Sequence, residues 1–437
     1  MNSTKHPTGA GRASRRARLA PLVLLTAATL AGAAACSSGS GSSGAGTSSA
    51  AGGASSPAAV SASSAPAAIA SFLPGKKATD TPVKIGLINN EGSSPVAEPA
   101  VGDAAVAAAD YANAELGGIA GHSIDVIRCS ENEDDASATA CANEMVQDQV
   151  AAVVIGTSGY GGVMVPIITK AGIPYVSVTA SAAAEGTTSG AFMWSGGYVA
   201  TLTGFAKYAA QQGYKKVTAY AIDTPASLDG ATALGDPIFK AAGVTLSVEG
   251  VPTAVPDATS QVTAGLAGKP DAVAVIADEG TCTSILKALN VVDPTIPRMV
   301  ITSCLSASVL SALGTSAMNG VKVFGASAPQ DSDAEAQLYQ YVMAKYYPKD
   351  STSGYTVTGY QSMLGLVRAT ASLTGTPTPA SITTAIKAAT DVPLPAAAGL
   401  TFTCDGTAVT GQPSDCSSAE VMVTVENGVG TDAQVIK

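Results

Sequence analysis

The sequence predicts an α/β protein with two lobes, each built on a doubly wound parallel sheet. Short β-branched runs alternate strictly with helical patterns along the chain, in two successive series. The run 152–155 contains no polar residue, which is typical of a parallel strand buried on both faces. The region from Thr81 onward, about 355 residues, is more than one hydrophobic core usually holds, so two lobes are expected.

The predicted strands fall into two series. The first comprises 83–88, 124–128, 152–155, 175–178 and 192–195, the last of which leads out of the first lobe. The second comprises 217–222, 244–251, 272–277, 299–302 and 321–324. Helical stripes separate the strands, and the chain ends in a strand at 421–425 followed by an Asn427-Gly428 turn.

The segment 151–181 is predicted to be one βαβ unit with a ligand-binding edge. Thr157 and Ser158 follow its first strand, and Thr179 and Ser181 follow its second. Ligands of open α/β sheets bind where parallel strands end, and the helix after the first loop has free N–H groups that suit an anionic oxygen. The alternative is that these hydroxyls only cap helices. The loop glycines do not match G-x-G-x-x-G, so a dinucleotide site is not indicated.

The first 36 residues are predicted to be an export signal, with a basic start and the apolar run 19–30. That run is too short for a permanent membrane span. Ala33-Ala34-Ala35 before Cys36 resembles a bacterial lipobox, so Cys36 is the expected lipidation site and membrane anchor. Cleavage without lipidation is the alternative, and the choice between Sec and Tat export stays open. Residues 37–80, rich in Ser, Gly and Ala, are a predicted disordered tether.

Seven cysteines in an exported chain suit one lipid anchor and an even set of disulfide partners. The cysteines after Cys36 allow fifteen pairings in principle. They fall into three local pairs, each separated by one loop or one βα unit. The predicted disulfides are Cys129–Cys141, Cys282–Cys304 and Cys404–Cys416.

The charged and catalytic residue types exclude several classes of function. The formal net charge is −10, and the basic residues of the export signal make the rest of the chain more acidic still, which argues against a nucleic-acid partner. His122 is the only histidine after the signal, so neither a His-dependent triad nor a His-rich metal site is predicted. With its cysteines paired, the chain offers no thiol nucleophile. No enzyme activity, cofactor or metal is expected.

Several segments share their order and spacing with one known family. They are 82–88, 94–97, 111–122, 131–135 and 172–177, followed by Tyr355, Tyr360, Gln361 and 426–428. Together they resemble type I periplasmic binding proteins, and in particular the leucine/isoleucine/valine-binding group of ABC importers. The resemblance implies a ligand held between two lobes joined by three crossings, near 194–197, 325–329 and 393–399. The implied lobes are 81–195 with 329–393, and 196–328 with 394–437.

The resemblance also implies ligand contacts. The first-lobe residues that would receive a carboxylate are Thr157, Ser158, Gly159, Ala180 and Ser181. Amino-acid binders usually hold the ligand ammonium with an acidic residue near Cys304, which is not acidic here. The second-lobe candidates are therefore Asp223, Ser227, Asp278 and Glu279. Trp194, at the first crossing, is expected either to stack on the ligand or to pack the hinge.

The predicted function is that of an extracytoplasmic, lipid-anchored solute-binding protein. It would capture a small polar ligand, such as an amino acid or a small carboxylate or amide, and deliver it as a monomer to the permease subunits of an ABC importer. The alternative is a ligand sensor of the same fold that acts with a membrane signalling partner. A neighbouring permease gene would favour transport, and a neighbouring kinase gene would favour sensing.

Overall fold

The computed structural model describes residues 65–93, 97–223, 225–253, 255–330 and 332–437, and the backbone only at 225–227 and 229. These residues all belong to one compact unit, 59–437. The predicted export signal, the predicted lipidation site Cys36 and residues 37–64 of the predicted tether lie outside the described residues. Within the described part of the chain, no helix is long and apolar enough to cross a membrane.

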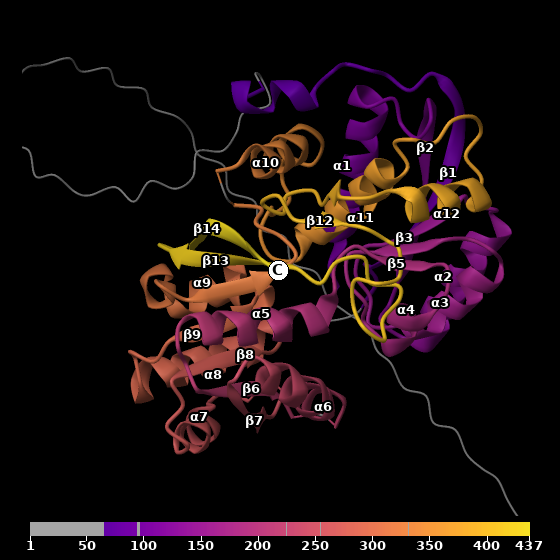
Figure 1. Ribbon diagram of the computed structural model, residues 1–437. Helices are drawn as coiled ribbons and strands as arrows, with labels where there is room; N and C mark the ends of the chain where they lie inside the picture. The colour runs from indigo at the N-terminus through magenta and orange to yellow at the C-terminus, as the bar shows by residue number, and fades with distance from the viewer. Residues whose placement is uncertain (1–64, 94–96, 224, 254, 331) are drawn as a thin grey trace, which may run out of the picture. The chain divides into compact units, whose positions relative to one another are not determined.

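The first sheet has five parallel strands in the order β2-β1-β3-β4-β5. They are β1 (Asp80–Asn90), β2 (His122–Glu131), β3 (Ala152–Ile155), β4 (Tyr175–Ser177) and β5 (Ala191–Met193). Helices α1 (Pro99–Glu115) and α11 (Thr356–Ala369) pack on one face, and α2 (Asp135–Gln147) and α3 (Gly161–Lys170) on the other (Figure 1). The strand β3 is buried at every residue because both faces are covered, as its apolar sequence predicts.

The second sheet has seven strands in the order β14-β13-β10-β9-β8-β6-β7. They are β6 (Lys216–Ile222), β7 (Thr245–Val251), β8 (Ala272–Ile276), β9 (Arg298–Ile301), β10 (Lys322–Gly325), β13 (Glu420–Glu426) and β14 (Val429–Ile436). The five strands from β6 to β10 are parallel, as predicted. The last two form an antiparallel hairpin on β10, turning at Asn427 and Gly428, which both have positive φ.

Helices also cover both faces of the second sheet. Helices α5 (Gly197–Gln211) and α6 (Pro225–Ala241) share a core with one face. Helices α7 (Thr259–Leu266), α8 (Glu279–Val292) and α9 (Ala307–Leu313) pack on the other. The predicted α/β class with two doubly wound lobes is therefore confirmed, and the antiparallel hairpin is an addition to it.

Shorter elements connect these layers. The remaining helices are α4 (Ala183–Thr187), α10 (Ala334–Tyr346), α12 (Pro379–Ala388), η2 (Thr302–Leu305) and η3 (Thr315–Met318). The strands β11 (Val392–Pro393) and β12 (Thr401–Phe402) form a separate two-stranded sheet.

The chain just before β1 is folded, so the predicted tether 37–80 is too long at its C-terminal end. A short 3₁₀ helix, η1 (Ala67–Phe72), buries Ile69 completely. The Phe72 carbonyl accepts a hydrogen bond from the Tyr111 hydroxyl at 2.6 Å. Ile69, Phe72 and Leu73 supply the apolar surface that packs this segment against the first-sheet core.

The last passage into the second sheet lies between Cys416 and Glu420, rather than near 393–399 as predicted. The Met193 N–H donates to the Ser414 carbonyl and the Cys416 N–H donates to the Met193 carbonyl, each at 2.8 Å. These bonds extend the first sheet at β5, its edge strand, whose polar groups would otherwise be unpaired. The segment before Glu420 thus contacts the first sheet, although the sequence assigned all of 394–437 to the second lobe.

Three disulfides join the predicted pairs. Cys129–Cys141 links β2 to α2, and Cys282–Cys304 links α8 to η2. Cys404–Cys416 closes the loop that pairs with β5. Each bond therefore fixes a connection outside the regular sheet hydrogen bonding.

Candidate ligand-binding site

A cavity of about 290 Å³ lies where strands of both sheets end. The first sheet contributes the loops that follow β3 and β4, and the second contributes the ends of β8, β9 and β10. Parallel strands bring their carboxyl ends to one edge, which is why segments far apart in sequence meet here. Five predicted ligand residues line the cavity: Thr157, Ser158, Thr179, Ala180 and Ser181.

Asn89 holds the loop after β3 in place. Its Oδ1 accepts a hydrogen bond from the Thr157 N–H at 2.9 Å, and its Nδ2 donates to Glu91 Oε1 and to the Glu98 carbonyl, each at 2.9 Å. A Cβ atom on Gly156 would lie 2.4 Å from Asn89 Oδ1, so only glycine allows this approach. The Thr157 N–H is consequently used within the protein.

The next two residues of this loop have different partners. Ser158 Oγ accepts a hydrogen bond from the Tyr160 N–H at 3.0 Å, which leaves the hydroxyl proton free to be donated. The Gly159 N–H donates to Glu133 Oε1 at 2.7 Å, and Gly159 does not line the cavity. Burial and a hydrogen bond with Glu131 raise the pKa of Glu133 to about 7, against the opposing effect of the Gly159 bond.

An internal carboxylate already receives the donors of Ser181. Glu185 is 1% exposed, and its Oε2 accepts from the Ser181 N–H (2.7 Å), the Ser181 hydroxyl (2.7 Å) and the Ala182 N–H (2.9 Å). Its Oε1 accepts from the Tyr175 hydroxyl at 2.5 Å. A Cβ atom on Gly161 would lie 2.1 Å from the Glu185 carboxyl carbon, so a glycine is required beside it. A ligand anion would compete with Glu185 for Ser181, and the ligand role of Ser181 stays a prediction.

Other donors on this side of the cavity remain available. The N–H groups of Ser158, Thr179 and Ala180 make no hydrogen bond within the described part of the chain. The hydroxyl of Ser158 adds a fourth donor. An anionic or carbonyl oxygen of a ligand can therefore be received at the ends of β3 and β4 without displacing Glu185.

Glu420 is an acidic residue that lines the cavity from the second sheet. It is the first residue of β13, and because β13 runs antiparallel to β10, Val421 pairs with Gly325 at the carboxyl end of β10. Glu420 is 2% exposed, and its Oε2 has no hydrogen-bond partner among the described residues. Burial raises the pKa of Glu420 to about 8, and a hydrogen bond with Thr201 opposes this shift. Without ligand, Glu420 is therefore mostly protonated at neutral pH.

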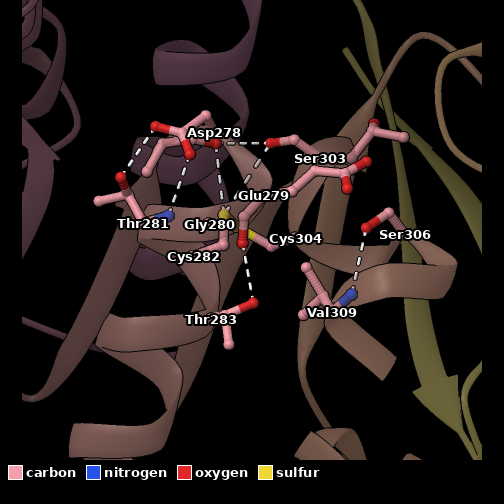
Figure 2. The surroundings of a disulfide bond; sticks show 12 residues. Asp278, Glu279, Gly280, Thr281, Cys282, Thr283, Ser303, Cys304, Ser306 and Val309 are labelled. Atoms are coloured by element: carbon pink, nitrogen blue, oxygen red, sulfur yellow. Dashed lines mark hydrogen bonds between the residues drawn. A yellow bond between two sulfur atoms is a disulfide. The ribbon is translucent and has the colours of Figure 1, made fainter. Parts of the chain in front are cut away.

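Asp278 and Glu279, two predicted second-lobe contacts, are bonded beside the Cys282–Cys304 disulfide and do not line the cavity (Figure 2). The Asp278 carboxylate caps α8, accepting from the Thr281 N–H at 3.0 Å and the Thr281 hydroxyl at 2.8 Å. The Glu279 carboxylate accepts a hydrogen bond from the Ser308 hydroxyl. Cys304, near which amino-acid binders usually have an acidic residue, forms the predicted disulfide with Cys282.

The other predicted contacts lie elsewhere. Asp223 is exposed at the end of β6 and does not line the cavity. The side chain of Ser227 is outside the described part of the structure. Trp194 is fully buried, stacks on Phe402 with ring centroids 4.7 Å apart and donates from Nε1 to the Ser362 carbonyl at 3.2 Å. Trp194 thus packs at the hinge and is not among the residues that line the cavity.

The lining residues that sequence reasoning did not assign to the site include Glu185, Gln361 and Glu420. Glu185 lies four residues after Ser181 at the start of a short helix, a spacing that favours the bond between them. Glu420 directly precedes the predicted strand 421–425, and its position at the cavity depends on an antiparallel pairing that the pattern did not predict. No group of three or more His, Cys, Asp or Glu side chains in the described ranges could hold a metal ion.

Comparisons with known proteins identify related folds. Residues 82–414 match the model of a family described as periplasmic binding protein. No curated protein matches the chain. One similar solved structure is that of the branched-chain amino acid transporter substrate-binding protein LivJ from Streptococcus pneumoniae, in complex with isoleucine. Its sequence is 20% identical to this one, and the TM-score is 0.64. The match covers 82% of this chain and 100% of LivJ.

Two further solved structures give the same result. The leucine-binding protein LivK from Thermotoga maritima is 17% identical with a TM-score of 0.64, covering 81% of this chain and 99% of that one. An ABC transporter substrate-binding protein from Sphaerobacter thermophilus is 17% identical with a TM-score of 0.67, covering 81% and 98%. At these identities the likeness shows the fold alone.

Proposed function

Because this chain belongs to the periplasmic binding protein family, we propose that it captures a small polar solute in the cavity between its two sheets and delivers it to an ABC importer. The family consists of binding proteins, so the chain is not an enzyme, and membership implies an extracytoplasmic location. Three disulfides suit that compartment.

The observation that carries the proposal is the cavity lined from both sheets. Its first-sheet side offers the N–H groups of Ser158, Thr179 and Ala180, and its second-sheet side offers Ile276 and Ile301. An amino acid, or a small carboxylate or amide, combines an oxygen for these donors with an apolar part for the second side. Binding would shift the equilibrium between an open and a closed arrangement of the two sides. The size of this shift is set by the difference in the ligand's affinity for the two states.

Attachment to the membrane forms the second part of the proposal. The lipobox-like sequence before Cys36 supports lipidation, and the Ser/Gly/Ala segment after it supports a flexible connection to the folded body. Replacing Cys36 with serine should release the exported protein from membranes into the medium or periplasm. Mass analysis of the N-terminal peptide should show a lipid on the parent and none on the variant.

A ligand screen tests binding directly. Thermal-shift measurements over amino acids, small carboxylates, amides and sugars should find a stabilising ligand, since binding to the folded state stabilises it by mass action. Ser158→Ala should weaken that ligand about tenfold, or about 1.4 kcal/mol, in calorimetry. Ser260→Ala, at an exposed position on α7, is the matched control and should leave affinity unchanged. A screen without any ligand would contradict the proposal.

Delivery is tested in cells. Cells that lack the protein should lose uptake of the labelled ligand, and the restored parent chain should recover it. Unchanged uptake, together with a lost transcriptional response to the ligand, would instead indicate the sensing alternative.

A further inference from the structure

A second cavity, of about 480 Å³, lies at the end of the second sheet that is away from the ligand cavity. Arg298 is the first residue of β9 and Lys322 the first of β10, and both line this second cavity. The last residues of the same strands, Ile301 and Gly325, line the ligand cavity. Lys322 pairs with Met299, so Arg298 and Lys322 leave the sheet on opposite faces, because side chains alternate along a strand. The second cavity therefore lies across the amino-terminal edge of the sheet and receives a cation from each face.

Arg298 is the one arginine of the described residues that forms no ion pair. Arg128 is paired with two carboxylates and Arg368 with one. Both of these are half-buried, whereas Arg298 is only 7% exposed. Burial lowers the pKa of Arg298, and the more distant charge of Asp293 opposes this shift. A buried charge is costly without a counter-charge, so this guanidinium favours an anion beside it.

The bonds that Arg298 does make are to uncharged oxygens at the end of α8. Its Nη1 donates to Asn290 Oδ1 at 2.5 Å, and its Nη2 donates to the Asp293 carbonyl at 3.3 Å. The Asp293 carboxylate instead accepts from the Thr295 N–H, the Thr295 hydroxyl and the Ile296 N–H. Two of the five guanidinium N–H groups are thus used, and the other three have no partner among the described residues. Bonds to neutral oxygens do not need a charged donor, so a structural role alone does not explain the charge.

The other polar side chains of this cavity also present donors. Because a guanidinium only donates, Asn290 Oδ1 is engaged with Arg298, and the Asn290 Nδ2 is left to donate. Asn319 Oδ1 accepts from a backbone N–H at 2.7 Å, which leaves its Nδ2 in the same state. Lys322 donates one of its three N–H groups to the Thr424 hydroxyl at 2.6 Å. No aspartate or glutamate is among the described residues that line the cavity.

Two tyrosines line the cavity on the α5 side. Tyr208 of α5 and Tyr214, just after this helix, are both half-buried, and their hydroxyls make no hydrogen bond within the described part of the chain. The Tyr208 ring is held by an edge contact with Phe324, with ring centroids 5.8 Å apart. Burial raises the pKa of Tyr208, so its hydroxyl keeps its proton at neutral pH and can donate it.

We propose that this second cavity binds a small oxyanion, carrying a phosphate or carboxylate group, through Arg298 and Lys322. The chain has a formal net charge of −10, so general attraction does not explain an anion here, and the local donors must supply the binding energy. Guanidinium groups match the geometry of both phosphate and carboxylate. This site is separate from the ligand cavity, and the inference does not depend on the proposed solute capture.

The test uses calorimetry and thermal-shift measurements on the purified exported protein at pH 7 in Tris buffer. The probes are inorganic phosphate, glycerol phosphate and citrate. At least one should bind with a dissociation constant of about 1 mM or tighter and raise the unfolding temperature. Tighter binding of glycerol phosphate than of inorganic phosphate would identify an esterified phosphate as the ligand, and the reverse would identify the free ion.

Three variants locate the bound anion. Arg298→Met removes the charge from a buried position while keeping an extended side chain, and it should weaken the probe at least about tenfold. Lys322→Gln can still donate to the Thr424 hydroxyl and should weaken the probe about 3- to 10-fold, which decides the matter if Arg298→Met does not fold. Lys287→Gln is the matched control, because Lys287 is exposed on α8 outside the cavity and the net charge changes equally. It should leave the affinity unchanged.

Several outcomes would overturn the inference. They are the absence of binding by all three probes, an unchanged affinity in Lys322→Gln and in folded Arg298→Met, and an equal loss in Lys287→Gln. Binding that is lost in Ser158→Ala and kept in Arg298→Met would place the anion in the ligand cavity and would also overturn it. A chain that binds a solute in the wider screen and none of these anions loses this inference alone, and the proposed function then stands.

Discussion

Replacing Glu420 with glutamine is expected to stabilise the unliganded protein, by an amount that grows with pH. The folded-state pKa of Glu420 is about 8, above its ordinary value of 4.5. Between these two pH values the folded chain binds more protons than the unfolded chain, so stability falls as pH rises. Glutamine keeps the shape of the side chain and carries no titrating proton.

The magnitude follows from the two pKa values. Near pH 4 the carboxyl group is mostly protonated in both states, and the variant and parent should have nearly equal free energies of unfolding. At pH 7 the unfolded chain has lost the proton and the folded chain has kept it. Between pH 4.5 and pH 7, about 2.5 pH units, the parent's free energy of unfolding therefore falls by about 1.36 kcal/mol per unit. The variant should therefore be about 3 kcal/mol more stable than the parent at pH 7.

Urea unfolding of ligand-free protein at several pH values measures this difference. Circular dichroism and Trp194 fluorescence should follow the same transition if the unfolding is two-state. Asp415 and Glu133, each with a pKa raised to about 7, add a pH dependence of their own, which cancels in the difference because both proteins contain them. The reasoning is refuted if the variant is less stable than the parent at pH 7, or if the difference does not change with pH.

Three further predictions concern stability. Gly365→Ala puts a Cβ atom 2.6 Å from Trp194 Nε1, so it should lower the free energy of unfolding by about 1–3 kcal/mol and shift the Trp194 fluorescence emission. Gly268→Ala is the control: its Cβ atom would have no atom within 4 Å, so stability should hardly change. Replacing both Cys282 and Cys304 with serine should lower the free energy of unfolding by about 3 kcal/mol in urea. Peptide mapping of the parent should recover the three local pairs. Any other partner for Cys282 would contradict the structure. A chain beginning at Gly75 lacks the buried Ile69, so its free energy of unfolding should be about 2–3 kcal/mol lower than that of a chain beginning at Ala65. Equal stabilities would show that η1 contributes nothing.

The strands were predictable because strands that are buried on both faces are short runs of mainly apolar, often β-branched residues. Runs such as 152–155 contain only apolar residues, and hydroxyl residues follow them where the sheet ends. The same rule placed Thr157, Ser158, Thr179 and Ser181 at the cavity, and the family resemblance added Ala180. Local cysteine spacing was sufficient for the disulfides, since each pair spans one connection.

Glu420 and the path of the chain before it could not be predicted in this way. The rule that ligands bind at strand ends considers the last residues of parallel strands, and Glu420 is the first residue of an antiparallel one. Its presence at the cavity depends on pairing between β13 and β10, which lie far apart in sequence. The hydrogen bonds of Ser414 and Cys416 to Met193 are likewise long-range, and no local pattern marks them.

β13 and β14 follow all three disulfide-bonded cysteine pairs in the sequence, which determines what a truncated molecule would retain. Without these two strands, β10 has an open edge and the cavity lacks the wall that Glu420 supplies. A molecule clipped before Glu420 would keep all six bridged cysteines and the residues of every first-sheet strand, so a disulfide count alone would not reveal that this wall is missing.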